Sequence, residues 1–326
     1  MNKIKSLALA VLAGASLVAA GAAAAQTYPD KPVRIIVPFT AGGLADVLAR
    51  GIGNELGKMW SQPIVVDNRP GANTIIAADA TAKAAPDGYT LLMANDPTLS
   101  SNQYLYTRLP YDPVKDFVPV VNIAGTLEVL VVSESFKGKS VQDLIAQAKA
   151  APGTMTYGTY GPGSKAHFDA EEFARITGVK LNHIPYKGVA DVMVAASAGQ
   201  IDMAFTGVPP ALPMVRANKL RVLAVAAPRR SSVLPDVPTF AEIGVPGFES
   251  KAWFGLVAPA GTPKAVVDKI AADVQKIIVK PEFQEKFITG VGLELINQGP
   301  EQYAEFLRHD REEYARQAKV INVKLD

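Results

Sequence analysis

Short apolar runs alternate along the chain with longer stretches in which apolar residues recur every third or fourth position. The short runs are typical of buried strands and the longer stretches are typical of amphipathic helices. Strands are predicted over residues 33–39, 63–67, 89–94, 130–132, 155–158, 181–186, 201–205, 222–225 and 253–259. Helices are predicted over residues 44–57, 75–85, 141–148, 165–176, 189–196, 264–278, 281–288 and 300–319. This alternation predicts an α/β fold with parallel strands.

The pattern restarts after Tyr111-Asp112-Pro113, which suggests a second unit. From residue 253 onward, one predicted strand is followed by helices, and no strand of comparable strength lies between those helices. The helices of this tail therefore have no sheet of their own to cover. We therefore predict that it packs back on the first unit. The predicted fold has two lobes joined by two crossing segments, with the ligand in the cleft between them. The first lobe comprises residues 26–125 and 253–326, and the second comprises residues 126–252.

The N-terminal segment predicts a secretory signal peptide. Lys3 and Lys5 precede a short apolar core, and Ala23-Ala24-Ala25 provides a small-residue cleavage pattern. We expect residues 1–25 to be removed and the mature protein to be periplasmic. Beyond the signal, no run approaches ~18 uninterrupted apolar residues, so a soluble mature chain without direct membrane insertion is expected.

Charge and composition exclude several classes of partner. The chain has 33 Lys+Arg and 31 Asp+Glu, and loss of Lys3 and Lys5 leaves 31 against 31. A near-neutral chain without basic runs argues against nucleic acid and anionic membranes. It has 3 His and no Cys, which argues against a zinc site and excludes disulfides. No metal or cofactor is predicted, and any anion site must be built locally. We expect a monomer.

The stretch VPFTAGGLAD, residues 37–46, ends one strand and opens a helix. It matches neither the phosphate-binding loop nor the dinucleotide-binding fingerprint. Exposed amides at a helix N-terminus can still hold an oxyanion. The alternative is a tight turn in which Asp46 satisfies the first-turn amides. The candidate ligand-binding residues here are Phe39, Thr40, Ala41, Gly42, Gly43, Leu44 and Asp46.

A second glycine-rich loop also follows a strand and precedes a helix. Its candidate ligand-binding residues are Thr159, Tyr160, Gly161, Gly163 and Ser164. Two such loops in two lobes could clamp a carboxylate between them, so that binding favours closure. His167, Lys187 and Thr206 are further candidates. Their structural alternatives are a helix-face histidine, a solvated lysine and an ordinary strand exit.

An enzyme is the less favoured interpretation. Ser164 and His167 have a spacing that could place them on one helix face, as a hydrolase would need. The G-x-S-x-G motif is absent, however, and no strand–elbow signature surrounds Ser164. We therefore predict a binding protein rather than an enzyme.

The ordered motifs VPFTAGGLAD, VVDNRPGAN, APDGYTLLM, LPYDPVKDF, HIPYKG, LPDVPTFAEIGVPGFE and WFGLVAPAGTP resemble the extracytoplasmic solute receptors of tripartite tricarboxylate transporters, the Bug (TctC-like) family. The resemblance runs from about Tyr28 to the last helix. It implies a two-lobed periplasmic binding protein that delivers a carboxylate to one small and one large membrane subunit. It also implies that the ligand carboxylate lies between the first Gly-Gly loop and the Gly-Ser loop, partly through ordered waters.

Three departures from the family pattern bear on the ligand. Leu44-Ala45 stands where a hydroxyl residue is usual, Tyr160 adds an aromatic ring, and Thr206-Gly207 replaces an acidic or amide pair. The site therefore lacks an obvious acid for a ligand ammonium, which makes amino acids less favoured. A dicarboxylate, or an aromatic carboxylate stacked on Tyr160, is favoured. A periplasmic sensor subunit for a signalling system remains an alternative role.

Overall fold

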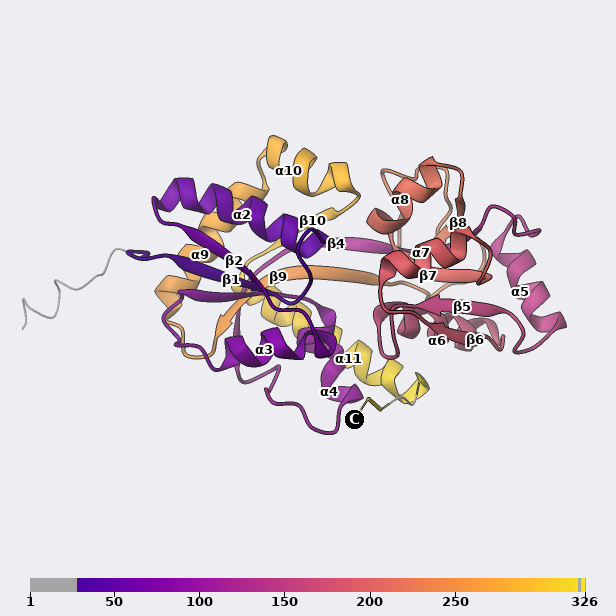
Figure 1. Ribbon diagram of the computed structural model, residues 1–326, viewed down its shortest axis with the longest axis horizontal. Helices are drawn as coiled ribbons and strands as arrows, with labels where there is room; N and C mark the ends of the chain where they lie inside the picture. Colours follow the sequence, from indigo (N-terminus) through magenta and orange to yellow (C-terminus); the bar gives the residue numbers. More distant parts are fainter. Residues whose placement is uncertain (1–27, 322–323, 326) are drawn as a thin grey trace, which may run out of the picture.

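The computed structural model describes residues 28–321, 324 and 325, so the predicted signal peptide lies outside the described residues (Figure 1). The strands are β1 (Val33–Val37), β2 (Ile64–Asn68), β3 (Thr90–Ala94), β4 (Phe117–Ser133), β5 (Thr156–Thr159), β6 (Asn182–Pro185), β7 (Met203–Gly207), β8 (Leu220–Val225), β9 (Lys251–Pro259) and β10 (Glu294–Gln298). The helices are α2 (Leu44–Trp60), α3 (Ile75–Ala82), α4 (Asn102–Leu105), α5 (Val141–Ala150), α6 (Lys165–Thr177), α7 (Val189–Ser197), α8 (Val208–Arg216), α9 (Lys264–Ile278), α10 (Pro281–Phe287) and α11 (Pro300–Ile321). Short helical turns cover residues 72–74, 97–101 and 289–291.

Every strand and helix predicted from the pattern is present, with shifted ends. The structure corrects the pattern in four places, one of which is the unpredicted four-residue helix α4. β4 is a strand of 17 residues, although only its last part was predicted. α8 and β10 were not predicted, and β10 lies where the tail was expected to lack a strand of comparable strength.

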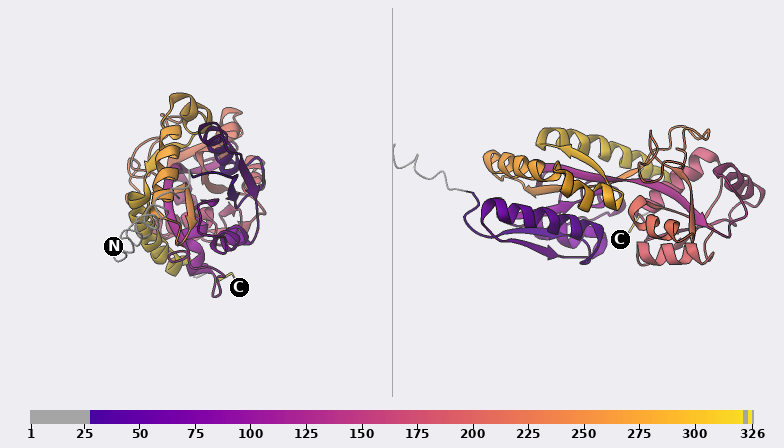
Figure 2. Two further views of the ribbon diagram at one scale, coloured as in Figure 1. Left: turned by 90° about the vertical axis from the view of Figure 1, so that its left-hand side faces the viewer. Right: turned by 90° about the horizontal axis from the view of Figure 1, so that it is seen from above.

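The first lobe is built on β1, which pairs in parallel with β2 and β3. β9 continues this sheet antiparallel to β3, and β4 follows antiparallel to β9. Side chains alternate across the sheet: Ile35 packs with α2 and α9, whereas Ile36 packs with α3 and α11. The tail therefore covers both faces of the first sheet, and Figure 2 shows it beside the N-terminal elements.

The second lobe repeats the arrangement with β5 between β6 and β7, all parallel. β7 and β8 both pair antiparallel with β4. Leu130 faces α5 and α6, whereas Val129 faces α7 and α8. The Ser140 side chain forms a capping box with Asp143 at the start of α5, as its position before the apolar face predicted.

β4 carries the chain from one lobe to the other. It pairs with β9 over residues 117–127 and with β7 from Glu128 onward. The predicted boundary between residues 125 and 126 thus falls inside this strand. Within the described residues, no helix is both long and apolar enough to cross a membrane.

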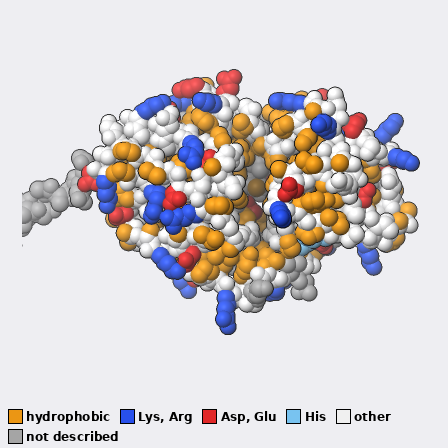
Figure 3. Space-filling model, in the orientation of Figure 1, with side chains coloured by type: hydrophobic (Ala, Val, Ile, Leu, Met, Phe, Trp, Pro, Cys, Tyr) orange, Lys and Arg blue, Asp and Glu red, His pale blue; other side chains and the backbone are white. Residues whose placement is uncertain are grey.

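Strand directions place both glycine-rich loops at the junction of the lobes. β1 runs in the same sense as the crossing strand β4, so its C-terminal end points toward the second lobe. β5 runs opposite to β4, so its C-terminal end points toward the first lobe. Figure 3 shows a groove between the two lobes at this junction.

Candidate functional site

The first loop turns at Gly42, whose φ of 84° is in the left-handed region. Its backbone N–H donates to Asp46 Oδ2 at 2.9 Å. Thr40, Ala41 and Gly42 are exposed, and Phe39, Gly43 and Leu44 are partly exposed. The loop therefore presents its backbone to solvent while one of its amides is already occupied.

The Asp46 carboxylate stabilises the first loop by accepting several hydrogen bonds. Arg50 Nε donates to Oδ2 at 3.0 Å, and Asn68 Nδ2 donates to Oδ1 at 2.9 Å. Asn68 also donates to the Phe39 carbonyl at 3.0 Å. Burial alone would raise the pKa of Asp46, but the hydrogen bonds from Arg50, Gly42 and Asn68 outweigh it and lower the pKa. Asp46 thus satisfies the Gly42 amide ahead of α2, whereas the alternative expected it to satisfy the first-turn amides of the helix.

The second loop has two left-handed glycines, Gly161 at φ 122° and Gly163 at φ 73°. Thr159 Oγ1 holds the turn through bonds of 3.2 Å to the carbonyl and amide of Gly161. Ser164 occupies the N-cap position of α6, yet its side chain makes no capping hydrogen bond. Its Oγ is buried and has no hydrogen-bond partner among the described residues.

His167 on α6 contacts the second loop through a backbone hydrogen bond. Its Nδ1 accepts the Gly163 N–H at 3.0 Å, which requires that nitrogen to be unprotonated. Its ring stacks on His183 at 4.4 Å between centroids, and His183 Nε2 lies 2.6 Å from Thr159 Oγ1. Burial, with the nearby His183, lowers the pKa of His167 to about 4. The arrangement makes His167 a positioning residue, whereas the hydrolase interpretation needed it to contact Ser164 as a base.

The remaining candidates lie in different settings. Tyr160 packs against the apolar clusters of the second lobe. Burial and the carboxylates of Glu128 and Asp96 raise the pKa of Tyr160 well above its usual range. Lys187 is exposed, as a surface lysine would be. Thr206 is buried with an unpartnered Oγ1, and its pairing with Val129 places it on the α7 and α8 face.

Sequence reasoning missed a buried charged cluster beside the second loop, which we call the junction cluster: Asp96, Glu128, Lys165 and Asp169. Lys165 Nζ lies 2.8 Å from Asp169 Oδ1, with side chains only 7% and 1% exposed. The four-residue spacing on α6 was a visible signal for this pair. Glu128 could have been noticed as a single acid within the apolar run 127–132. The expectation that the site lacks an obvious acid for a ligand ammonium was drawn without these three acids.

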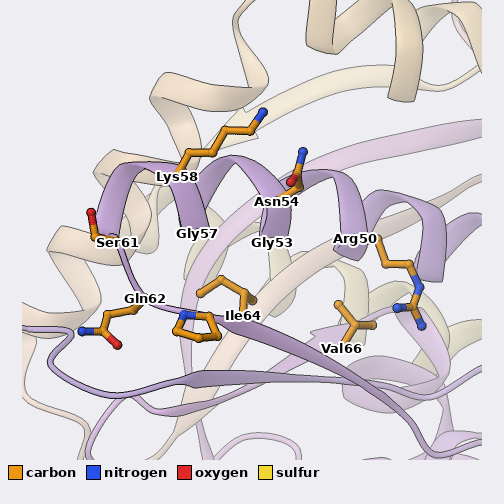
Figure 4. A pocket seen from close by; sticks show the side chains of 10 residues that line it. Arg50, Gly53, Asn54, Gly57, Lys58, Ser61, Gln62, Ile64 and Val66 are labelled. Carbon is orange, nitrogen blue, oxygen red and sulfur yellow. The ribbon is translucent and has the colours of Figure 1, made fainter.

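A separate open pocket of about 670 Å³ lies between α2 and β2. Figure 4 shows Gly53 and Gly57 on the helix above Ile64 of the strand. A Cβ at Gly53 would approach Ile64 Cγ2 at 3.1 Å, so the glycine serves close packing of helix on strand. The sequence did not predict this pocket, and its lining includes neither glycine-rich loop.

The chain is similar to one protein family along most of its length. The model of the tripartite tricarboxylate transporter family receptor matches residues 48–324. Protein BugT of Bordetella pertussis is 35% identical over 326 residues, which is 100% of this chain and 100% of BugT.

Two solved structures from Rhodopseudomonas palustris are similar in fold and sequence. Rpa4515 with adipate superposes with a TM-score of 0.84 at 33% identity, covering 91% of this chain and 99% of that one. MatC (Rpa3494) with bound malate superposes with a TM-score of 0.79 at 30% identity, covering 90% of this chain and 100% of that one.

These similarities confirm the resemblance drawn from the ordered motifs and the predicted two-lobed α/β fold of a periplasmic binding protein. The chain belongs to the tripartite tricarboxylate transporter receptor family, the solute-binding receptors that include the Bug proteins.

Proposed function

We propose that this protein is a periplasmic receptor that captures a small carboxylate between its two lobes and delivers it to the membrane subunits of a tripartite transporter. The first lobe, residues 26–125 and 253–326, closes against the second lobe, residues 126–252. The observation that carries the proposal is the placement of two glycine-rich loops at facing strand ends of the two lobes. No bond chemistry is involved in capture or release.

In the first loop, the contacts come from first-turn backbone amides of α2 such as that of Leu44, because the Gly42 amide donates to Asp46 and the Gly43 amide donates to the Thr40 carbonyl at 3.4 Å. In the second loop, they come from the α6 N-terminus and the unpartnered Ser164 hydroxyl. Lys187 and Thr206 flank these loops as further candidates. A ligand that bonds to both loops stabilises the closed arrangement of the lobes.

A dicarboxylate or an aromatic carboxylate is the favoured ligand. The structures of relatives with adipate and malate support the dicarboxylate class. The test is a thermal-shift screen of the mature protein against monocarboxylates, dicarboxylates, tricarboxylates and aromatic carboxylates. Ligand stabilisation grows as RT ln(1 + [L]/Kd), so a true ligand raises the melting temperature with concentration.

Substitution of Ser164 by Ala separates a receptor from a hydrolase. A receptor loses affinity for its carboxylate in this variant, and the wild type releases no product from esters or amides. Turnover by the wild type that S164A abolishes would contradict the proposal. Reconstituted transport that depends on this protein and on both membrane subunits would support delivery over sensing.

A further inference from the structure

A smaller pocket of about 130 Å³ lies in the first lobe, between α11 and the sheet. Its sheet wall includes Pro119 of β4, which pairs with Val257 of β9. At about 3.3 Å per strand residue, Pro119 is about 30 Å from the lobe junction at Glu128. None of the lining residues belongs to a glycine-rich loop. The pocket is therefore separate from the carboxylate site proposed between the lobes.

The pocket is apolar and open to solvent. Every lining residue except Arg311 is apolar, and Leu99, Phe117 and Leu307 among them are buried. Val114, which also lines the pocket, is 56% exposed. A small molecule can therefore reach the pocket from solvent and pack against apolar side chains.

Arg311 occupies an apolar position of its helix. Ala304, Leu307 and Arg311 recur every three or four residues, which places them on one face of α11. Leu307 is only 3% exposed and packs in the core of the first lobe. Arg311 is partly exposed and lines the pocket beside it, and burial lowers the pKa of the Arg311 guanidinium.

The acids closest to Arg311 are engaged with other groups. Asp310 accepts a hydrogen bond from Trp253 Nε1 at 3.0 Å, and Asp112 pairs with Lys115 Nζ at 3.3 Å. Both carboxylates act on the guanidinium through space, without a hydrogen bond or an ion pair to it among the described residues. The Arg311 donors therefore have no acceptor of their own in the described chain.

The other arginines differ from Arg311 in this respect. Within residues 28–321, nine of them form an ion pair with Asp or Glu. The two others, Arg108 and Arg216, are exposed, so water can solvate them. Among the arginines of these residues, only Arg311 is both partly buried and without an acid at bonding distance. Because a guanidinium that loses water needs other acceptors, an anion in the pocket would be stabilised.

The chemistry of the pocket selects the class of anion. Apolar walls with one placed polar group are typical of small-molecule sites. A guanidinium donates two parallel hydrogen bonds to a planar carboxylate. A single cation favours a monoanion, because a second negative charge would face apolar walls. A volume of about 130 Å³ corresponds to about four molecules of liquid water, so it admits a short alkyl chain.

We propose that the pocket around Arg311 binds a short-chain aliphatic monocarboxylate of about four or five carbons. The carboxylate bonds to the guanidinium, and the alkyl chain packs against Leu99, Phe117 and Leu307. This site goes beyond the proposed function, since its ligand lies within the first lobe and carries a single charge. The two ligands therefore bind without competing.

The first test titrates the mature wild-type protein with acetate, propionate, butyrate, pentanoate and hexanoate, followed by ligand-observed NMR. We expect butyrate to bind with a Kd of about 1 mM, as befits so small a ligand. Affinity should rise about fourfold with each methylene from acetate to butyrate and level off beyond pentanoate. 1-Butanol, which lacks the charge, should bind at least about tenfold more weakly than butyrate. Affinity independent of chain length, or equal binding of butanol, would overturn the inference.

The second test uses Arg311→Met, which keeps an unbranched apolar side chain and removes the charge. We expect R311M to bind butyrate at least about tenfold more weakly than the wild type. Arg308→Met is the matched control, because Arg308 is on the same helix but is exposed and paired with Glu305 and Glu312. R308M should keep the wild-type Kd within about twofold. Full affinity in R311M would show that Arg311 does not bind the carboxylate.

Backbone amide shifts of the wild-type protein locate the bound butyrate. We expect the shifts to change around Leu307 and Arg311 and to stay constant at Gly161 and Ser164. Changes confined to the second glycine-rich loop would place butyrate between the lobes and overturn the inference, while leaving the proposed function intact. If no dicarboxylate or aromatic carboxylate binds, the proposed function fails, but the butyrate titration still decides this site. If R311M does not fold, the chain-length series and the amide shifts of the wild type decide.

Discussion

The backbone N–H of Gly163 donates to Nδ1 of His167 at 3.0 Å, so a side chain on α6 fixes the loop that precedes the helix. His167→Ala removes the acceptor and leaves this amide without its partner. We expect a loss of about 1–3 kcal/mol in the free energy of unfolding. We also expect about tenfold weaker carboxylate binding, because the loop is no longer held in its binding geometry.

His167→Asn is the control for this prediction, because the Asn side-chain oxygen can take the place of Nδ1. Both variants lose the ring stacking on His183, so the difference between them isolates the hydrogen bond. Denaturant unfolding and ligand titration measure the two effects. Equal affinity of H167A and H167N for the ligand would show that the bond does not position the loop.

The fold followed from the sequence because burial on both faces makes most strands continuous apolar runs. β4 was only partly predicted, since Pro119, Asn122 and Gly125 interrupt its apolar pattern. Its 17 residues are stabilised by partners from both lobes, which a local pattern cannot reveal. α8 was missed because Pro209 and Pro210 lie in its first turn, where proline is tolerated, and Pro213 lies inside it.

The two glycine-rich loops of the candidate site could be located from the sequence, because their turns depend on the backbone conformation of glycine. Both glycine turns were identified from their glycines and from the strand and helix patterns around them. The junction cluster was not, because its members are far apart in sequence and are brought together by the crossing strand and by α11. The Tyr314 hydroxyl donates to Asp96, but the two residues are 218 positions apart in the sequence. No local pattern near either loop could therefore predict this contact.

Gly42 and Gly43 are adjacent, but only Gly42 requires glycine. Its φ of 84° is unfavourable for residues with a Cβ, whereas a Cβ on Gly43 would meet only the Thr40 carbonyl, at 3.4 Å. Gly42→Ala should therefore cost about 1 kcal/mol of stability and weaken ligand binding. Gly43→Ala should change stability by less than about 0.5 kcal/mol. Thermal unfolding of both variants tests this, and an equal loss in the two would refute the distinction.

Asp46 stabilises the first loop through its bonds to Gly42, Arg50 and Asn68. Asp46→Ala leaves the Gly42 amide without its acceptor and removes one of the two acceptors of Asn68 Nδ2. We expect a loss of about 2 kcal/mol of stability together with weaker binding. Asp268→Ala is the control, since its pair with Lys264 has the same four-residue spacing but is exposed, and should cost about 0–0.5 kcal/mol. A similar loss of stability in D268A would show that Asp46 contributes no more than an exposed ion pair of the same spacing.

Asp96 makes the stability of the unliganded protein depend on pH. Burial raises the pKa of Asp96 to about 7, although Lys165 and the Tyr314 hydroxyl oppose the rise and Asp310 adds to it. An acid whose pKa is raised by folding binds more protons in the folded state, so it contributes stability at low pH. That contribution is lost as pH rises from about 4 to about 7. The acid Glu128, whose pKa is also raised by burial, acts in the same sense.

Asp96→Asn keeps an acceptor for Tyr314 and cannot ionise. Between pH 5 and pH 8 the stability of D96N relative to the wild type should therefore rise by about 3 kcal/mol. His167, with its pKa lowered to about 4, destabilises the folded state below about pH 6.5, in the opposite sense. Because His167 is present in both proteins, its effect on stability cancels when D96N is compared with the wild type at each pH. Denaturant unfolding at pH 5, 6, 7 and 8 gives the difference directly. A difference that stays constant with pH would show that Asp96 keeps the same charge throughout this range.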